Sequence, residues 1–173
     1  MKYWYMLPCG VNEKSVGDAI IDIFRQYYTD PAVEVTLYIS STGGDIDAAI
    51  RFYDFIKSLN VNVTTVGFGQ VDSAAVVLLL SGTERTLMKD CRVRLHQPTY
   101  NGPQQSQVIS VHLETVSLLQ ALDKRYFEIM SSELSMKEDD LRSLLSEGKV
   151  LSAEEALKLN IATKVGDKLP IDK

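Results

Sequence analysis

Ser73 and His96 stand where a parallel α/β fold places reactive side chains. Ser73 precedes the apolar run 74–80 within "GQVDSAAVVLLLSG". A serine there either caps the start of a buried helix or acts as a nucleophile beside the unpaired N–H groups of the helix end. His96 ends "RVRLH" and precedes "QP", so it lies at a strand terminus, where it could serve as the base that a serine nucleophile needs. The segment lacks the G-x-S-x-G pattern of a hydrolase nucleophile elbow.

A glycine turn, Thr42-Gly43-Gly44-Asp45, is the second place where the residue types allow chemistry. Two glycines after a strand let the backbone approach a ligand closely, and free N–H groups face outward at the following helix start. Such a turn can bind a phosphate or a developing oxyanion. The lysine and the spacing of a Walker phosphate loop are missing, and a glycine pair alone can be only a turn.

Alternating strands and helices must position these residues. Clean period-2 alternation predicts a strand at 33–40, and apolar residues at helical spacing predict helices over 13–28 and 104–134. The strand–helix–strand order indicates a parallel sheet with crossover helices. Further strands are expected at 1–7, 61–69, 86–88 and 92–96, and short helices after Asp45 and Ser73.

Helix ends can be located from polar residues in the sequence. Asp45 is expected to cap the helix that follows the glycine turn. Ser135 with Glu138, and Ser152 with Glu155, have the spacing of capping boxes that start helices. Asn160 is expected to end the last helix in a left-handed conformation.

Composition excludes several classes of protein. The 173 residues are enough for one domain with a sizeable core, and 45% are apolar. A net charge of −5 without basic runs argues against a nucleic-acid or anionic-membrane partner. There is no membrane-length apolar run, and the N-terminal stretch "MKYWYMLPCG" does not read as a signal peptide, so a cytoplasmic protein is expected. Cys9 and Cys91 lack metal-ligand spacing, so we expect two reduced, buried cysteines and no metal. The second histidine, His112, falls inside the predicted long helix and is expected to be solvated or packed.

Taken together, these segments resemble the Clp protease proteolytic subunit family. The resemblance rests on "LYISSTGGDIDAAIRFYDFIKSL", "GQVDSAA", "VRLHQP" and "LSAEEALKLNIA". The family counterparts, in the same order, are Y-I-N-S-P-G-G, G-Q-A-A-S-M-G, M-I-H-Q-P and L-S-A-x-E-A. The spacing from Gly44 to Ser73 fits the family without a gap, and the likeness covers about residues 37–165.

The resemblance implies a serine endopeptidase without a cofactor. Ser73 would be the nucleophile and His96 the general base. The backbone N–H groups of Gly44 and Ala74 would form the oxyanion hole. The substrates would be peptides and unfolded protein chains.

The resemblance also implies an architecture. The fold would be an α/β crotonase-like spiral of ββα units forming a single domain over 1–173. Its core would be about 1–100 and 150–173, and a long protruding handle helix would span about 104–134. The handle would join stacked heptameric rings of the same chain, and a Clp-type ATPase would thread substrates into the chamber.

The sequence departs from the family pattern in ways that affect function. Gly148 stands where the family has the third, acidic member of its triad, and Glu147 is the best substitute, although it could equally be a solvated residue at a helix end. Asp72 precedes the nucleophile where the family has a small residue; it either faces away at the helix start or opposes an oxyanion. Thr42 replaces a proline, and Ala74-Ala75 replaces Met-Gly. The chain starts almost at its first strand, which argues against a Clp-type ATPase partner.

Three functions therefore stay open. The first is an active serine peptidase that uses Ser73, His96 and Glu147. The second is a catalytically weak or inactive ring subunit or scaffold, supported by Gly148 and Asp72. The third is another crotonase-fold enzyme that acts on an acyl thioester, against which the Ser73–His96 pair argues.

Overall fold

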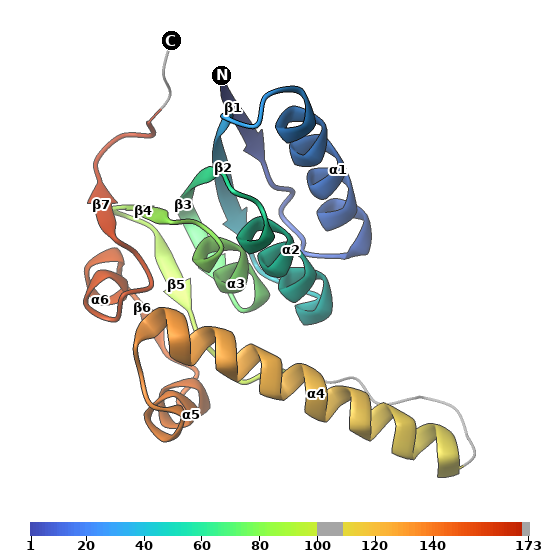
Figure 1. The fold of residues 1–173 in the computed structure, drawn as a ribbon. Coiled ribbons are helices and arrows are strands. Elements are labelled where there is room, and N and C mark those ends of the chain that lie inside the picture. Colours follow the sequence, from blue (N-terminus) through green and yellow to red (C-terminus); the bar gives the residue numbers. More distant parts are fainter. Residues whose placement is uncertain (100–108, 171–173) are drawn as a thin grey trace.

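A parallel sheet forms the body of the molecule, and one long helix projects from it (Figure 1). The computed structural model describes residues 1–99 and 109–170. The sheet runs in the order β1-β2-β3-β4-β7, and these neighbours are all parallel. The bounds are β1 (Lys2–Met6), β2 (Glu34–Ser41), β3 (Asn62–Asp72), β4 (Glu84–Met88) and β7 (Lys164–Gly166).

A small branch leaves this sheet beside the candidate site. The end of β3 pairs in parallel with β5 (Arg92–Arg94), and β5 pairs antiparallel with β6 (Val150–Leu151). β3 thus changes partner along its length, with β4 beside its first half and β5 beside its second half. This division brings the chain after β5 to the carboxyl end of β3, where ligand sites of parallel sheets are found.

Helices cover one face of the sheet. They are α1 (Glu13–Thr29), α2 (Ile46–Ser58) and α3 (Ala74–Leu80), and every residue of α3 is buried. The buried side chains of these helices and of the central strands form one core. In β2, Val35, Leu37 and Ile39 are buried as the period-2 pattern predicts, and Val33 just before the strand is buried too.

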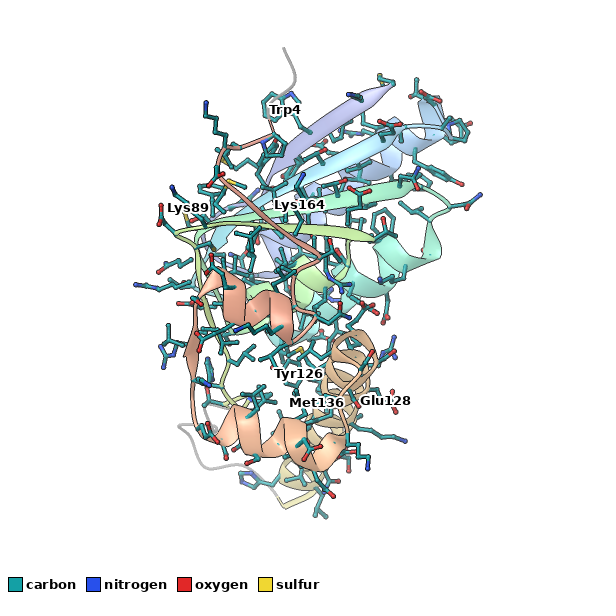
Figure 2. The ribbon with its side chains drawn as sticks, turned by 90° about the vertical axis from the view of Figure 1, so that its left-hand side faces the viewer. Trp4, Lys89, Tyr126, Glu128, Met136 and Lys164 are labelled. Carbon is teal, nitrogen blue, oxygen red and sulfur yellow. The ribbon has the colours of Figure 1, made fainter. Side chains whose placement is uncertain are left out.

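The opposite face of the sheet is polar where strands β1 to β4 and β7 meet. A depression of about 450 Å³ there is lined mainly by Thr, Glu, Asn and Lys side chains, among them Thr36, Thr64, Thr86 and Lys164. Figure 2 shows Lys164 on this face. Trp4 is 71% exposed at the β1 edge of the sheet.

The projecting helix is α4 (Ile109–Leu134), which is followed by α5 (Glu138–Ser146) and α6 (Ala153–Lys158). In Figure 1 its first half extends well beyond the body, and α5 lies beside its second half. Tyr126 on α4 points toward the body and is buried, whereas Glu128 points outward (Figure 2). The predicted helix began at residue 104; residues 104–108 lie outside the described part of the chain.

Several local predictions are confirmed. Asp45 caps α2 by accepting from the N–H groups of Asp47 and Ala48, at 2.9 and 3.2 Å. Ser152 and Glu155 form the capping box of α6. Asn160 follows α6 with a φ of +58°.

The capping box predicted at Ser135 is wrong. Ser135 has a φ of +51° and belongs to the end of α4. The N–H of Met136 bonds to Ser131 O at 3.1 Å, and the N–H of Ser135 bonds to Ser132 O at 3.3 Å. These two bonds form a Schellman closure, which uses a left-handed residue at this place. Helix α5 starts after Lys137, whose side chain makes no capping bond.

Candidate active site

Ser73 connects the end of β3 to the start of α3 in a strained conformation. Its φ of 56° and ψ of −126° lie where residues other than glycine are rare. Such a conformation costs about 1–3 kcal/mol and is concentrated at functional sites. Its side chain makes no capping hydrogen bond, so helix capping does not explain this serine. The strand–turn–helix geometry is that of a nucleophile elbow, although the sequence lacks the elbow pattern.

Backbone hydrogen bonds hold Ser73 in this position. The Ser73 N–H donates to Arg94 O at 2.9 Å, and Ser73 O accepts from Val76 N at 2.9 Å. The first bond continues the β3–β5 ladder, in which Asp72 is the register partner of Arg94. Because His96 follows Arg94 by two residues, this pairing also brings His96 toward Ser73.

The glycine turn packs directly against Ser73. Gly43 has a φ of +88°, and a Cβ added to it would lie 2.5 Å from Asp72 O and 2.8 Å from Ser73 Cβ. Gly44 has a φ of +145°, and a Cβ there would lie 2.2 Å from Val11 O. Both positions therefore require glycine, which lets the turn fit between two backbone segments.

Two backbone N–H groups beside Ser73 are left for a ligand. Val11 bonds to the turn on either side of Gly44, through Gly43 O and Asp45 N, both at 2.9 Å. The N–H of Gly44 has no backbone acceptor in the described part of the chain. Ala74 is the first residue of α3, where the N–H group has no partner within the helix. This arrangement can bind a developing negative charge.

A cavity of about 340 Å³ collects four of the predicted site residues: Gly44, Ser73, Ala74 and His96. Its apolar wall comes from α4, through Leu118, Leu119, Leu122 and Tyr126. Pro98 and Leu119 also line an adjoining groove of about 320 Å³, so the cavity continues along α4. Apolar residues at helical spacing predicted a helix over 104–134, but nothing in the sequence indicated that Leu119, Leu122 and Tyr126 line the site.

His96 is half-buried, just beyond the end of β5. Its Nδ1 lies 2.7 Å from the carbonyl oxygen of Gln97. Among the described residues, no hydrogen bond joins His96 to Ser73. Bonds between catalytic groups are often long in ligand-free enzymes and tighten when substrate binds.

Glu147 is exposed at the end of α5, and its carboxylate makes no hydrogen bond or ion pair within the described ranges. The neighbouring Gly148 has a φ of +61°, and an added Cβ would meet nothing within 4 Å. The Leu95 N–H donates to Lys149 O at 3.0 Å, so this segment does pass beside His96. The role of Glu147 as the third acid stays a prediction.

Asp72 is buried beside the nucleophile, with only 7% of its surface exposed. Its Oδ1 has no hydrogen-bond partner in the part of the chain that the structure describes. Buried carboxylate oxygens are normally hydrogen-bonded, because burying them unpaired costs free energy. Asp72 is therefore not solvated, and it is not among the described residues that line the cavity with Ser73 and His96.

The two cysteines differ in exposure. Cys91 is buried as expected, and burial together with the nearby Asp72 carboxylate raises the pKa of its thiol to about 12. Cys9 is exposed, which corrects the expectation that both are buried. Residues 1–99 and 109–170 contain no cluster of His, Cys, Asp or Glu side chains that could hold a metal ion. In the same ranges, no helix has the length and apolar character needed to span a membrane.

Comparison with known proteins identifies the family. The family model described as Clp protease matches residues 6–168. A relative in Corynebacterium glutamicum, ATP-dependent Clp protease proteolytic subunit 1, is 32% identical over 91% of this chain and 76% of its own length. A relative in Nocardia farcinica, proteolytic subunit 3, is 31% identical over 91% of this chain and 72% of its own. Proteolytic subunit 2 of Frankia casuarinae is 27% identical over 90% of this chain and 71% of its own. With its parallel α/β sheet, its glycine turn against Ser73 and this match over most of its length, the chain belongs to the Clp protease family.

Proposed function

We propose that this protein is a serine endopeptidase in which Ser73 attacks the peptide carbonyl and His96 acts as general base. The observation that carries the proposal is the strained backbone of Ser73, at the mouth of a cavity that it shares with His96. Strain of this kind persists only where the surrounding structure enforces it, and the β5 ladder and the glycine turn both do so.

The reaction follows from the groups around the cavity. Ser73 Oγ would attack the carbonyl carbon while His96 takes the hydroxyl proton and later gives it to the leaving amine. The N–H groups of Gly44 and Ala74 would donate to the oxyanion. Removing one such donor typically lowers turnover by about 10²–10³-fold. Water then hydrolyses the acyl-enzyme by the same route.

The cavity also suggests the substrate. Its wall is made of leucine side chains and the ring of Tyr126, so it suits an apolar residue next to the scissile bond. The open groove along α4 leaves room for an extended peptide. We propose that the substrates are peptides and unfolded chains, in line with the proteolytic subunits that the chain resembles.

Assembly is the second part of the proposal. Several apolar residues of α4 are exposed, among them Val111, Leu113 and Val116, at 37%, 63% and 49%. A row of such residues on a projecting helix indicates a contact surface. We propose that α4 is the handle that joins stacked rings of this chain. A Clp-type ATPase partner is supported by the names of the relatives, which are ATP-dependent Clp protease proteolytic subunits.

A catalytically weak ring subunit is the alternative, and Asp72 favours it. A buried carboxylate next to the nucleophile would oppose the negative charge of the oxyanion. Among the described residues, no carboxylate is bonded to His96, and this also favours the catalytically weak subunit.

Labelling with a fluorophosphonate, followed by intact mass, distinguishes the two functions. An activated serine forms a phosphonyl adduct and releases fluoride. We expect one adduct on the wild type and on Ser146→Ala, an exposed serine outside the cavity, and none on Ser73→Ala. Absence of an adduct on a folded, assembled wild type would contradict the peptidase and support the weak subunit.

A further inference from the structure

The contact between His96 and Gln97 favours one tautomer of the imidazole. A carbonyl oxygen only accepts, so the 2.7 Å contact to Gln97 O is a hydrogen bond when the proton is on Nδ1. In the neutral ring, Nε2 is then unprotonated, as a general base requires. We propose that the main-chain carbonyl of Gln97 is the positioning group of His96, so that the site works as a Ser73–His96 pair oriented by a neutral acceptor instead of an acid. This inference rests on the proposed peptidase function.

Four described carboxylates lie near the cavity or His96. Asp72 is buried beside Ser73 but is not among the described residues that line the cavity. Asp45 lines the cavity, but its Oδ1 caps α2 through the N–H groups of Asp47 and Ala48. Asp123 lines the adjoining groove and lies 3.7 Å from Arg142. Glu147 is exposed, and its carboxylate makes no hydrogen bond or ion pair among the described residues. None of these groups is bonded to His96 Nδ1, whereas the Gln97 carbonyl is.

The sequence restricts the backbone that carries this carbonyl. Pro98 follows Gln97, and a residue before proline is kept out of the helical region by the proline ring. This restriction narrows the directions in which the Gln97 carbonyl can point. On the other side of His96, the Leu95 N–H donates to Lys149 O at 3.0 Å, which holds the backbone that leads into His96.

The proton balance of the reaction does not require an acid. Ser73 Oγ forms a bond to the carbonyl carbon while its proton moves to His96 Nε2, and the C=O electron pair moves to oxygen. In the imidazolium, the second proton stays on Nδ1 and remains hydrogen-bonded to Gln97 O. Nε2 then protonates the leaving amine as the C–N bond breaks, and His96 returns to its neutral form. A neutral acceptor orients the ring throughout but stabilises the cation less than a carboxylate would.

Nitrogen NMR of His96 tests the proposal without any need for activity. The chain has two histidines, and His112 is exposed on α4, so His112→Gln leaves one imidazole to observe. Solid-state ¹⁵N spectra of the sedimented, histidine-labelled protein above pH 8 should show the proton on Nδ1. We expect the same tautomer in Glu147→Gln. A proton on Nε2, or a tautomer that switches in Glu147→Gln, would overturn the proposal.

A second test measures the rate of fluorophosphonate labelling in Pro98→Ala. Pro31→Ala, at an exposed turn, is the matched control. Releasing the Gln97 backbone should mix the two tautomers and slow fluorophosphonate labelling by about 10-fold or more. Pro31→Ala should change neither measurement. Unchanged labelling and tautomer in Pro98→Ala would also overturn the proposal. If the wild type carries the Nδ1 proton but forms no fluorophosphonate adduct, the peptidase function is contradicted and the role of the Gln97 carbonyl is not. Failure of the proposed function and failure of this inference are therefore distinguishable.

Discussion

At the scale of single residues, the site combines a strained backbone with a buried, unpaired carboxylate oxygen at adjacent positions. Ser73 has a backbone conformation that favours glycine, and Asp72 has a buried oxygen without a partner among the described residues. Both features lower stability, and neither is needed for packing. Residues that break local rules in this way are expected at functional sites.

Replacing Ser73 with glycine should stabilise the fold while abolishing catalysis. Glycine adopts positive φ without a steric penalty, so Ser73→Gly should be more stable than Ser73→Ala by about 1 kcal/mol. Urea unfolding of the two variants measures the difference. Equal stabilities would mean that Ser73 is not strained. Neither variant should react with a fluorophosphonate.

Removing the charge of Asp72 should speed acylation. Asp72→Asn keeps the shape of the side chain and deletes the negative charge beside the oxyanion site, so the labelling rate should rise about fivefold. Asp90→Asn makes the same charge change at an exposed position and serves as the control. A slower Asp72→Asn would indicate that the carboxylate helps to organise the site.

The sequence singled out residues that the structure brings to one cavity, but it did not indicate their surroundings. Ser73, His96 and the glycine turn could be found because strand and helix ends are visible in the hydrophobic pattern. The Gln97 carbonyl could not, because every residue has one and only the folded backbone gives its direction. The burial of Asp72 was equally hidden, since the strand that carries it extends past Gly69, where the alternation ends.

At the scale of elements, one polar cluster fixes the base of α4. Glu133 accepts from Tyr53 OH at 2.6 Å, from Arg85 Nη1 at 2.7 Å and from Lys57 Nζ at 2.9 Å. Asn160 Nδ2 donates to Glu133 O at 2.6 Å, and Asn160 O accepts from Arg85 Nη2 at 2.9 Å. The cluster thus joins α2, β4 and the end of α6 to the last turn of α4.

Glu133 should make stability depend on acid pH. Burial raises the pKa of Glu133, but the donors Tyr53 and Lys57 and the charges of Lys57 and Arg85 outweigh it, so the net pKa is lowered. The stabilisation is therefore present above the unfolded-state pKa, about 4.3, and is lost as the pH falls through the folded-state value.

Glu133→Gln should therefore cost about 2 kcal/mol at pH 7 and less at pH 3. Urea unfolding at the two pH values measures both costs. Glu128→Gln, an outward-facing neighbour on the same helix, is the control. A cost that does not depend on pH would show that the charge of Glu133 is unimportant.

Helix ends show how far local sequence can decide an element. Ser135 and Ser152 both precede a glutamate by three residues, yet only Ser152 starts a helix. Ser135 follows a helix that is still running, so the chain uses it for the left-handed closure of α4. The serine–glutamate spacing is the same in both cases. The two cases differ because a helix runs directly into Ser135, so local spacing alone cannot decide where a helix starts.

At the scale of the whole molecule, the proposed assembly depends on the exposed apolar side of α4. Leu113→Glu places a charge on the projecting half of the helix, at a side chain that is 63% exposed and lies outside the described core. We expect it to reduce the mass of the assembly, measured by size-exclusion chromatography with light scattering, without unfolding the chain. Leu157→Glu, at a leucine of α6 that is 39% exposed, should leave the mass unchanged. Equal masses for Leu113→Glu and wild type would contradict the handle role of α4.

The attachment of α4 also makes its projecting half a lever, because the second half is packed on the core as far out as Tyr126. Leu118, in the cavity wall, lies 8 residues from Tyr126, or about 12 Å along the axis. A tilt of about 5° at Tyr126 would shift Leu118 by about 1 Å, a displacement of the size that can cost about 100-fold in rate. A force on the far end of α4 would therefore reach the mouth of the cavity through this wall.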